Sequence, residues 1–327
     1  MSKSIPAGTR DILPEEMREL RAIEATLGEL FEAAGYGEVQ TPVLEFEQES
    51  AGREGEAAYR FFDRSGSALA LRSDMTVPIA RLVASRFRDE ELPLRLRYSG
   101  RIYRSVQPQR GAMRELHQVG VELIGADGPA GTIEVIRLLV AALDAIGLRR
   151  AVVGLGDADL FRQLLDELEV AGPARDHILA CLQAHDLVAI EAEAGDLAGI
   201  DDAARRTIVA VSNLRGGAEV LERARAIGGA AVERSSSRLA EIHEGLEAAG
   251  IADRVQLDLG LLRGLGYYTG AILEVYDPAH GDLLGGGGRY DELLGTFGRP
   301  LPAAGFALYL DRLHIAQAAE DARGAGA

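Results

Sequence analysis

The sequence predicts an α+β protein in which an antiparallel sheet is flanked by helices and carries a helical insertion. Several segments repeat apolar residues every three or four positions, which is typical of amphipathic helices. Residues 94–98 and 118–124 instead alternate between apolar and polar, as half-buried strands do. The stretch from about residue 157 to residue 250 keeps the helical period throughout, so it predicts a helical insertion between segments of strand character.

The N-terminal elements follow from spacing and turn residues. The first predicted helix repeats its apolar residues at Leu20, Ile23, Leu27, Leu30 and Phe31 and ends near Gly35. A short strand closes at Thr41-Pro42. The next segments predict a hairpin over residues 61–72, turning at Ser65-Gly66, and a helix over residues 76–86.

The middle and C-terminal elements complete the expected sheet. The two alternating segments predict antiparallel strands joined by a loop, and a helix over residues 136–146 and a strand over residues 151–155 come next. After the insertion, strand character returns over residues 270–277. The glycines of residues 285–288 predict a loop that leads into residues 306–313.

Composition excludes several classes of protein. The 327 residues suggest about two domains, or one large domain with an insertion, at roughly 150 residues per domain. With 47% apolar and 26% charged residues the chain has an average globular mixture. Its net charge is −16, from 35 bases and 51 acids, which argues against a broad nucleic-acid or anionic-membrane surface.

Single residues narrow the chemistry further. Cys181 is the only cysteine and Lys3 the only lysine, so an internal disulfide, a cysteine-pair zinc site, a P-loop lysine and a Schiff-base lysine are all excluded. The histidines lack metal-ligand spacing and no nucleophile has a partner. We therefore expect no catalytic residue, metal or cofactor. With no signal segment and no run approaching ~18 apolar residues, we expect a cytoplasmic protein without a membrane partner.

A basic window stands out in this acidic chain. Residues 95–114 contain no acid, and their arginines are Arg95, Arg97, Arg101, Arg104, Arg110 and Arg114. Arginine holds a carboxylate or phosphate through paired hydrogen bonds, so the window suggests an anion site. The alternative is a solvated hairpin whose arginines pair with surface acids.

Two further segments suggest a pocket. Gln118, Gly120 and Glu122 share one strand face opposite Val119, Val121 and Leu123, and they form either a groove floor or, as the residues alone favour, an exposed sheet face. The segments over residues 263–270 and 285–295 combine glycines with arginines and tyrosines. Strand alternation predicts that only one of Tyr267 and Tyr268 lines a pocket; the alternative is a mobile glycine loop with structural tyrosines. His117 falls on the Val119 face, where a structural role is expected.

Several segments together resemble the histidyl-tRNA synthetases. They are GTRDILPEE from residue 8, LHQVGVELIG, RGLGYYTG, GGRYDEL and PAAGFALYLDRL, and the resemblance runs from residue 8 to about 313. It implies a class II aminoacyl-tRNA synthetase-like fold, with an antiparallel sheet flanked by helices and a dimer formed through the first helix and strand. It also implies that the whole of residues 1–327 forms that core fold with the insertion at about 157–250.

Departures from the synthetase pattern concern ATP and tRNA. Only 15 residues follow Arg312, so we expect no anticodon-binding domain and no tRNA partner. The resemblance places ATP contacts where this chain has Val106, Gln107, Ala112, Tyr309 and Asp311, and Gly266 replaces an aspartate. Tyr309 stands where the synthetases have a glycine that makes room for the nucleotide, so ATP activation is expected to be disabled.

Positions that match the synthetases' histidine pocket are retained. They are Asp74, Thr76, Arg104, Gln118, Glu122, Arg263, Tyr268 and Tyr290, of which Asp74 is one methylene shorter than the glutamate of the synthetases. We expect the histidine carboxylate near Arg104 or Arg263, its ammonium near Asp74 and Thr76, and its imidazole near Glu122 and Tyr268. The effector site could instead lie at an interface between subunits.

This combination resembles the regulatory subunits of ATP phosphoribosyltransferase. The resemblance implies a noncatalytic subunit that joins a short-form catalytic subunit in a hetero-octamer, supports the first step of histidine biosynthesis and transmits feedback inhibition by histidine. Two alternatives remain: a free-standing synthetase-like ligase that activates histidine or a related amino acid, since Arg104 and Arg312 are retained, and an oligomerisation scaffold with a relic pocket.

Overall fold

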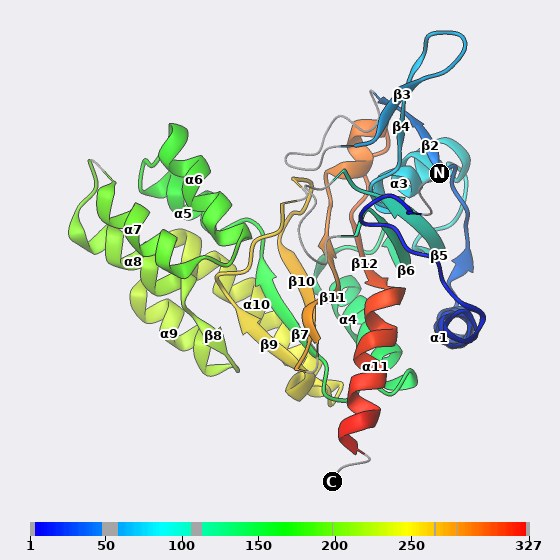
Figure 1. Ribbon diagram of the computed structural model, residues 1–327. Helices are drawn as coiled ribbons and strands as arrows, with labels where there is room; N and C mark the ends of the chain where they lie inside the picture. Colours follow the sequence, from blue (N-terminus) through cyan, green and yellow to red (C-terminus); the bar gives the residue numbers. More distant parts are fainter. Residues whose placement is uncertain are drawn as a thin grey trace.

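The computed structural model describes residues 4–47, 58–105, 113–197, 199–264, 266–278 and 280–324. A nine-stranded sheet runs through the molecule in the order β1-β5-β6-β12-β11-β10-β7-β9-β8 (Figure 1). Its strands are β1 (Gly37–Glu38), β5 (Leu94–Tyr103), β6 (Glu115–Ile124), β7 (Val152–Asp157), β8 (Arg215–Gly216), β9 (Val255–Asp258), β10 (Ala271–Asp277), β11 (His280–Arg289) and β12 (Ala303–Tyr309). The six strands from β5 to β7 in this order pair antiparallel, whereas β1 on β5 and β9 on β7 are parallel.

A second sheet and the helices surround this sheet. The small sheet has the order β2-β4-β3, from β2 (Leu44–Phe46), β3 (Arg60–Phe62) and β4 (Ala68–Leu71). The helices are α1 (Pro14–Ala33), α3 (Thr76–Arg86), α4 (Gly128–Ala145), α5 (Leu160–Glu167), α6 (Gly172–Gln183), α7 (Leu187–Asp196), α8 (Asp202–Ser212), α9 (Glu219–Ile227), α10 (Ala230–Ala248) and α11 (Leu310–Gly324), with short 3₁₀ helices η1 (Ala252–Arg254) and η2 (Leu293–Phe297). The α+β fold class with an antiparallel sheet flanked by helices is thus confirmed.

The two faces of the sheet carry two different cores. Helices α1, α4 and α11 cover one face, and their apolar residues pack on Val119, Val121 and Leu123 of β6. Helix α3 and η2 lie on the other face, where the second core includes Tyr98, Tyr268 and further tyrosines. Because successive strand residues point to opposite faces, Gln118, Gly120 and Glu122 face the α3 side.

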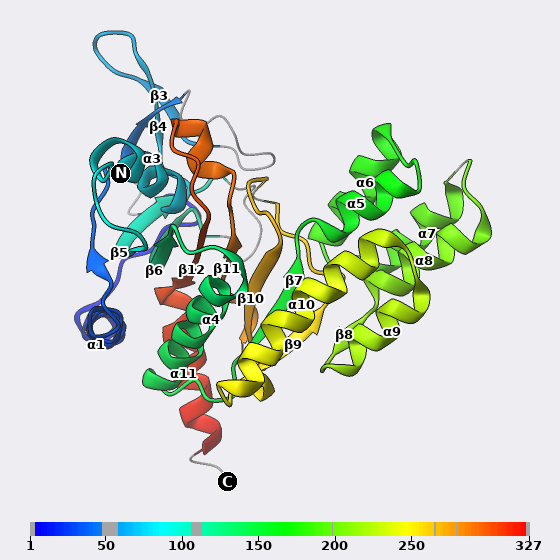
Figure 2. The same cartoon turned by 180° about the vertical axis from the view of Figure 1, so that it is seen from behind.

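The insertion lies beyond the β7 end of the sheet. Between β7 and β9 the chain forms α5 to α10 and the two-residue strand β8. In Figure 1, α5 to α9 project away from the sheet, and in the view from behind (Figure 2) α10 returns beside α4. Ile178, Cys181 and Leu182 of α6 belong to the same core cluster as the sheet residues, so the insertion packs on the sheet through a continuous apolar core. Cys181 is buried in this core.

Some local predictions match the structure and others do not. The hairpin that turns at Ser65-Gly66 and the helix over residues 76–86 are confirmed. The predicted glycine loop at residues 285–288 is wrong, because these residues lie in the interior of β11 between β10 and β12. Residues 306–313 form the end of β12 and the start of α11.

Close packing explains the glycine run in β11. A Cβ built on Gly285 or Gly287 would collide with a carbonyl oxygen of the neighbouring strand β12. The glycines therefore permit close approach of two backbones, not a turn. In the ranges described above, no helix has the length and apolar composition needed to cross a bilayer.

Candidate functional site

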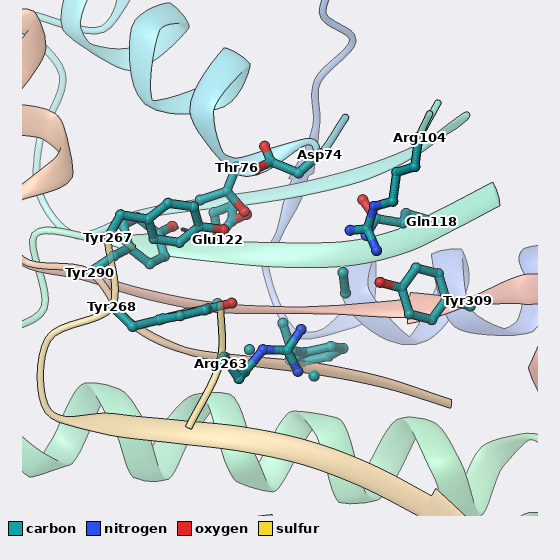
Figure 3. Close-up of a pocket in the computed structure, with 15 residues that line it drawn as sticks. Asp74, Thr76, Arg104, Gln118, Glu122, Arg263, Tyr267, Tyr268, Tyr290 and Tyr309 are labelled. Carbon is teal, nitrogen blue, oxygen red and sulfur yellow. Dashed lines mark hydrogen bonds between the residues drawn. The ribbon is translucent and has the colours of Figure 1, made fainter. Parts of the chain in front are cut away.

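The eight side chains assigned to an amino-acid pocket all line one cavity on the α3 face of the sheet (Figure 3). They come from the start of α3, the end of β5, strand β6, the loop between β9 and β10, and the end of β11. Asp74, Thr76, Arg104, Gln118, Glu122, Arg263, Tyr268 and Tyr290 are joined there by Tyr267, Gly286, Gly287, Gly305, Phe306, Ala307 and Tyr309. Residues as far apart in sequence as Asp74 and Tyr309 therefore meet in one place.

Glu122 is the centre of a hydrogen-bond network on the floor of the cavity. Its side chain is only 1% exposed. The Thr76 hydroxyl donates to Oε1 at 2.8 Å, and the Tyr290 hydroxyl donates to Oε2. Burial raises the pKa of Glu122 to about 8, and the hydrogen bonds from Tyr290 and Thr76 oppose that shift only in part. A carboxyl group with this pKa can take up or release a proton near neutral pH when a charged ligand binds.

Glycines make room for this network. Gly305 of β12 is the register partner of Glu122, and a Cβ built on it would collide with Glu122 Oε2. A Cβ on Gly120 would lie 2.6 Å from the Tyr98 hydroxyl. Real Cβ atoms do not approach so closely, so a side chain at either position would displace the pocket floor.

The first turn of α3 forms the adjoining wall. The buried Asp74 accepts a hydrogen bond from the backbone N–H of Val77 at 3.1 Å, which fixes its carboxylate at the start of the helix. Thr76, the first helical residue, points to Glu122. The wall thus presents a carboxylate and a hydroxyl oxygen side by side, a pair that suits an ammonium group.

Arg104 and Tyr309 close the opposite end of the cavity (Figure 3). The Arg104 guanidinium lies 5.8 Å from the centre of the Tyr309 ring and donates to the Ser73 carbonyl at 3.3 Å. Arg312 lies over the same ring at 4.7 Å. Two cations on one buried aromatic ring hold it in place by cation–π attraction.

Arg263 forms the lower wall. Its Nη1 donates to the Leu273 carbonyl at 3.1 Å, and its guanidinium lies 5.8 Å from the centre of the Tyr268 ring. A Cβ on Gly286 would collide with this guanidinium, so the glycine creates the space that the arginine occupies. A buried guanidinium at the cavity wall can receive a carboxylate.

The tyrosine prediction is wrong in one respect. Both Tyr267 and Tyr268 line the cavity, their ring centres 4.8 Å apart, and Tyr267 also packs edge-on against Tyr290 at 5.9 Å. Strand alternation does not apply because the described residues between β9 and β10 contain no strand. The irregular backbone lets two successive rings lie on the same side.

The cavity is nearly filled by its own side chains. The space open to the centre of a water molecule is about 20 Å³, enough for roughly one water. A ligand of amino-acid size therefore requires side chains to move. Arg104, Arg263 and Tyr309 are the long side chains at the cavity edge (Figure 3).

Three other arginines of the basic window pair with carboxylates outside the cavity. Arg95 binds Glu134 at 2.8 Å, Arg97 binds Glu38 at 2.9 Å and Arg101 binds Glu115 at 2.7 Å. For these three the alternative of paired surface arginines is confirmed. Arg104, in contrast, lies in the cavity. Arg110 lies outside the described residues, as do Val106, Gln107 and Ala112.

The polar face of β6 is buried, so the exposed sheet face that the residues alone favoured is wrong. Gln118 is 4% exposed and lies in the cavity. His117 has the expected structural role on the other face, where its Nε2 lies 2.8 Å from the Ser99 hydroxyl oxygen and 3.7 Å from Glu24. Among the residues that the structure describes, no cluster of side chains could hold a metal ion.

Sequence reasoning missed some of the lining residues. Gly305, Phe306 and Ala307 of β12 lie in the cavity, and Tyr309 was identified as a departure from the synthetases but not as a lining residue. A usable signal is the alternation along β12, because Gly305, Ala307 and Tyr309 occupy every second position and share the face of Glu122.

Comparison with known proteins shows the family of the chain. The family model of histidyl-tRNA synthetase matches residues 8–313. The ATP phosphoribosyltransferase regulatory subunit of Moorella thermoacetica is 46% identical over 319 residues, which cover 96% of this chain and 82% of that protein.

Two solved structures have the same fold. The first is described as an ATP phosphoribosyltransferase regulatory subunit/histidyl-tRNA synthetase from Bacillus halodurans, with a TM-score of 0.88 and 33% identity over 97% of this chain and 84% of that one. The second is a histidine–tRNA ligase subunit from Alicyclobacillus acidocaldarius, with a TM-score of 0.85 and 30% identity over 98% and 99% of the two chains. The chain therefore has the class II histidyl-tRNA synthetase-like fold and belongs to the family of ATP phosphoribosyltransferase regulatory subunits.

Proposed function

We propose that this chain is a noncatalytic cytoplasmic subunit that binds free histidine in the cavity around Glu122 and transmits feedback inhibition to a short-form catalytic subunit. The observation that carries the proposal is that the polar groups of an amino-acid site are assembled in one cavity while the Tyr309 ring occupies its Arg104 end. The assembly would be a hetero-octamer that contains homodimers of this chain, and it would catalyse the first step of histidine biosynthesis.

The cavity suits the three polar parts of histidine. Arg104 or Arg263 would receive the carboxylate, and Asp74 with Thr76 would receive the ammonium. Glu122 would face an imidazole nitrogen, with Tyr268 beside the ring. Because Glu122 is buried, either a neutral carboxyl that donates or a carboxylate that accepts can match the imidazole nitrogen.

Feedback then follows from linkage. If histidine binds more tightly to one assembly state than to another, it shifts the complex toward that state by its difference in binding free energy. Couplings of this kind are typically about 1–3 kcal/mol, which changes the equilibrium between the assembly states by roughly 5- to 150-fold. The nearly filled cavity supports two states, because side chains must move before histidine enters.

The decisive experiment measures phosphoribosyl transfer to ATP by the short-form catalytic subunit from the same genome, with and without this chain, over a histidine titration. We expect this chain to stimulate the reaction and histidine to reverse the stimulation. Glu122→Ala should remove the sensitivity to histidine and keep the stimulation. Unchanged inhibition in Glu122→Ala would move the histidine site elsewhere, for instance to a subunit interface.

A ligase that activates histidine is the competing function. The retained Arg104 and Arg312 favour it, because they match arginines of the synthetase motifs. Histidine-dependent exchange of pyrophosphate into ATP requires an intact activation site, so we expect no exchange by this chain. Exchange above background, together with no effect on the catalytic subunit, would establish the ligase. If calorimetric titration detects no binding of histidine, the remaining alternative is an oligomerisation scaffold.

A further inference from the structure

The α5–α6 end of the helical insertion contacts the wall of the cavity through its side chains. The wall consists of the described part of residues 263–274, which runs from Arg263 through Tyr268 into β10. Arg162 of α5 donates to the Tyr268 carbonyl at 3.4 Å. Gln183 at the end of α6 lies beside Gly264, where a Cβ would be 3.2 Å from its Oε1. The third contact is made by His185, which follows α6.

His185 reaches the cavity through one intermediate residue. Its Nε2 lies 3.5 Å from Oε2 of Glu274, and Oε1 of Glu274 lies 3.7 Å from Nη1 of Arg263. Glu274 is 4% exposed and stands on β10 on the same face as Ile272, which belongs to the core on the cavity side. A buried carboxylate thus lies between a cation of the cavity wall and an imidazole of the insertion.

The charges in this chain of contacts support one another. Burial raises the pKa of Glu274, but the contact with His185 and the charge of Arg263 outweigh it, so the net pKa is below its usual value. The same contact raises the pKa of His185 above its ordinary value. Asp258 of β9 adds to that effect, while burial and Arg215 of β8 oppose it. Tyr276 of β10 donates its hydroxyl to Glu274.

His185 has a backbone conformation that is unfavourable for histidine. Its φ is +53°, in the left-handed region where glycine or asparagine is usual. The turn is closed by hydrogen bonds from the N–H of His185 to the Leu182 carbonyl and from the N–H of Asp186 to the Cys181 carbonyl. The short link from α6 to α7 thus places the imidazole against the sheet.

We propose that His185 and Glu274 are positioning residues for Arg263, and that they couple the position of the helical insertion to the occupancy of the amino-acid cavity. This inference rests on the proposed histidine site and names the part of the chain that responds to it. A ligand carboxylate at Arg263 competes with Glu274 for the guanidinium. Glu274 then depends on His185 for its remaining positive partner, so a bound ligand tightens the hold of the insertion on the sheet.

The test compares two histidines of the same helical hairpin. His185→Ala removes the partner of Glu274, whereas His177→Ala removes a similar pair, His177 with Glu193 at 3.0 Å, which joins α6 to α7 away from the cavity wall. Histidine and histamine, which lacks the carboxylate, are titrated calorimetrically into each full-length variant. We expect His185→Ala to weaken histidine binding about tenfold and histamine binding less than twofold, and His177→Ala to change neither.

A purely structural role would give a different pattern. It would weaken binding of both ligands equally, or His177→Ala would match His185→Ala, and either result overturns the proposal. His185→Gln keeps a donor for Glu274 and should restore at least half of the lost affinity. A wild-type chain that binds neither ligand would instead refute the proposed histidine site, so the two failures are distinguishable.

Hydrogen exchange tests the coupling directly. In the wild-type chain, saturating histidine should slow amide exchange over residues 172–196 at least threefold. In Glu274→Gln, which keeps the shape of the side chain but removes its charge, histidine at saturation should leave exchange in this segment unchanged. Equal protection of α6 and α7 in both proteins would contradict the proposal.

Discussion

Gly305 lies directly opposite Glu122 across the β12–β6 ladder, and the absence of a side chain at Gly305 leaves the space that the Glu122 carboxylate occupies. A strand glycine has no packing side chain and costs stability by itself. Here the missing side chain makes room for a buried carboxylate in the interior of an antiparallel sheet. Thr76 and Tyr290 then complete its hydrogen bonds from two other parts of the chain.

We expect Gly305→Ala to destabilise the chain by about 1–3 kcal/mol and to remove histidine binding. The new Cβ would collide with Glu122 Oε2 and with the Val121 carbonyl, so the carboxylate cannot keep its position. Urea unfolding and calorimetric titration measure the two effects. Gly281→Ala is the control, because a Cβ at Gly281 on β11 meets nothing within 4 Å. Normal histidine affinity in Gly305→Ala would show that the position of Glu122 does not matter.

We expect the stability of the ligand-free chain to decrease as pH rises, because of Glu122. Its folded-state pKa is raised from 4.5 to about 8, so between these values the folded state holds a proton that the unfolded state has lost. The free energy of unfolding therefore decreases by up to about 1.4 kcal/mol per pH unit across this window. Glu122→Gln lacks this contribution, so its free energy of unfolding should increase relative to that of the wild type as pH rises from 4.5 to 8. Urea unfolding at several pH values measures the difference. If the free energies of unfolding of the two proteins change in parallel with pH, the raised pKa is contradicted.

The face of β6 shows what the sequence does and does not determine. Period-two alternation correctly places Gln118, Gly120 and Glu122 together, because side-chain direction is a local property of a strand. Whether that face is exposed depends on what covers it. Thr76 and Tyr290, which cover Glu122, lie 46 and 168 residues away in sequence, so alternation alone could not predict the burial.

For the glycines of β11 the local sequence pattern predicts the wrong secondary structure. Four successive glycines are typical of a loop, and their strand conformation depends on contacts with β10 and β12 that no local pattern contains. Tyr267 and Tyr268 were assigned alternate directions on the assumption of a strand. The described residues of this segment form no strand, so period-two alternation does not apply to them.

We expect Tyr309→Ala to give the chain measurable ATP affinity. The ring lies against Arg104 and Arg312, and its removal leaves both guanidinium groups without their aromatic partner in the space beside them. Titration with ATP measures the gain, and Tyr309→Phe is the matched control because it keeps the ring in place. Truncating this buried side chain should also cost about 3–5 kcal/mol of stability. Equal ATP affinity in the alanine and phenylalanine variants would show that the ring does not block the nucleotide.

We expect Arg104→Ala and Arg101→Ala to separate the two roles of the basic window. Arg104 lines the cavity, so its loss should weaken histidine binding at least tenfold. Arg101 pairs with Glu115 at 2.7 Å near the surface, and an exposed pair of this kind contributes about 0.2–1 kcal/mol. Its loss should leave histidine affinity unchanged and lower stability slightly. The same titrations with histamine assign the carboxylate: a variant that loses affinity for histidine but not for histamine has lost the group that receives it. Arg101→Ala with the larger effect on histidine would place the ligand on the outer face of the hairpin and refute the cavity site.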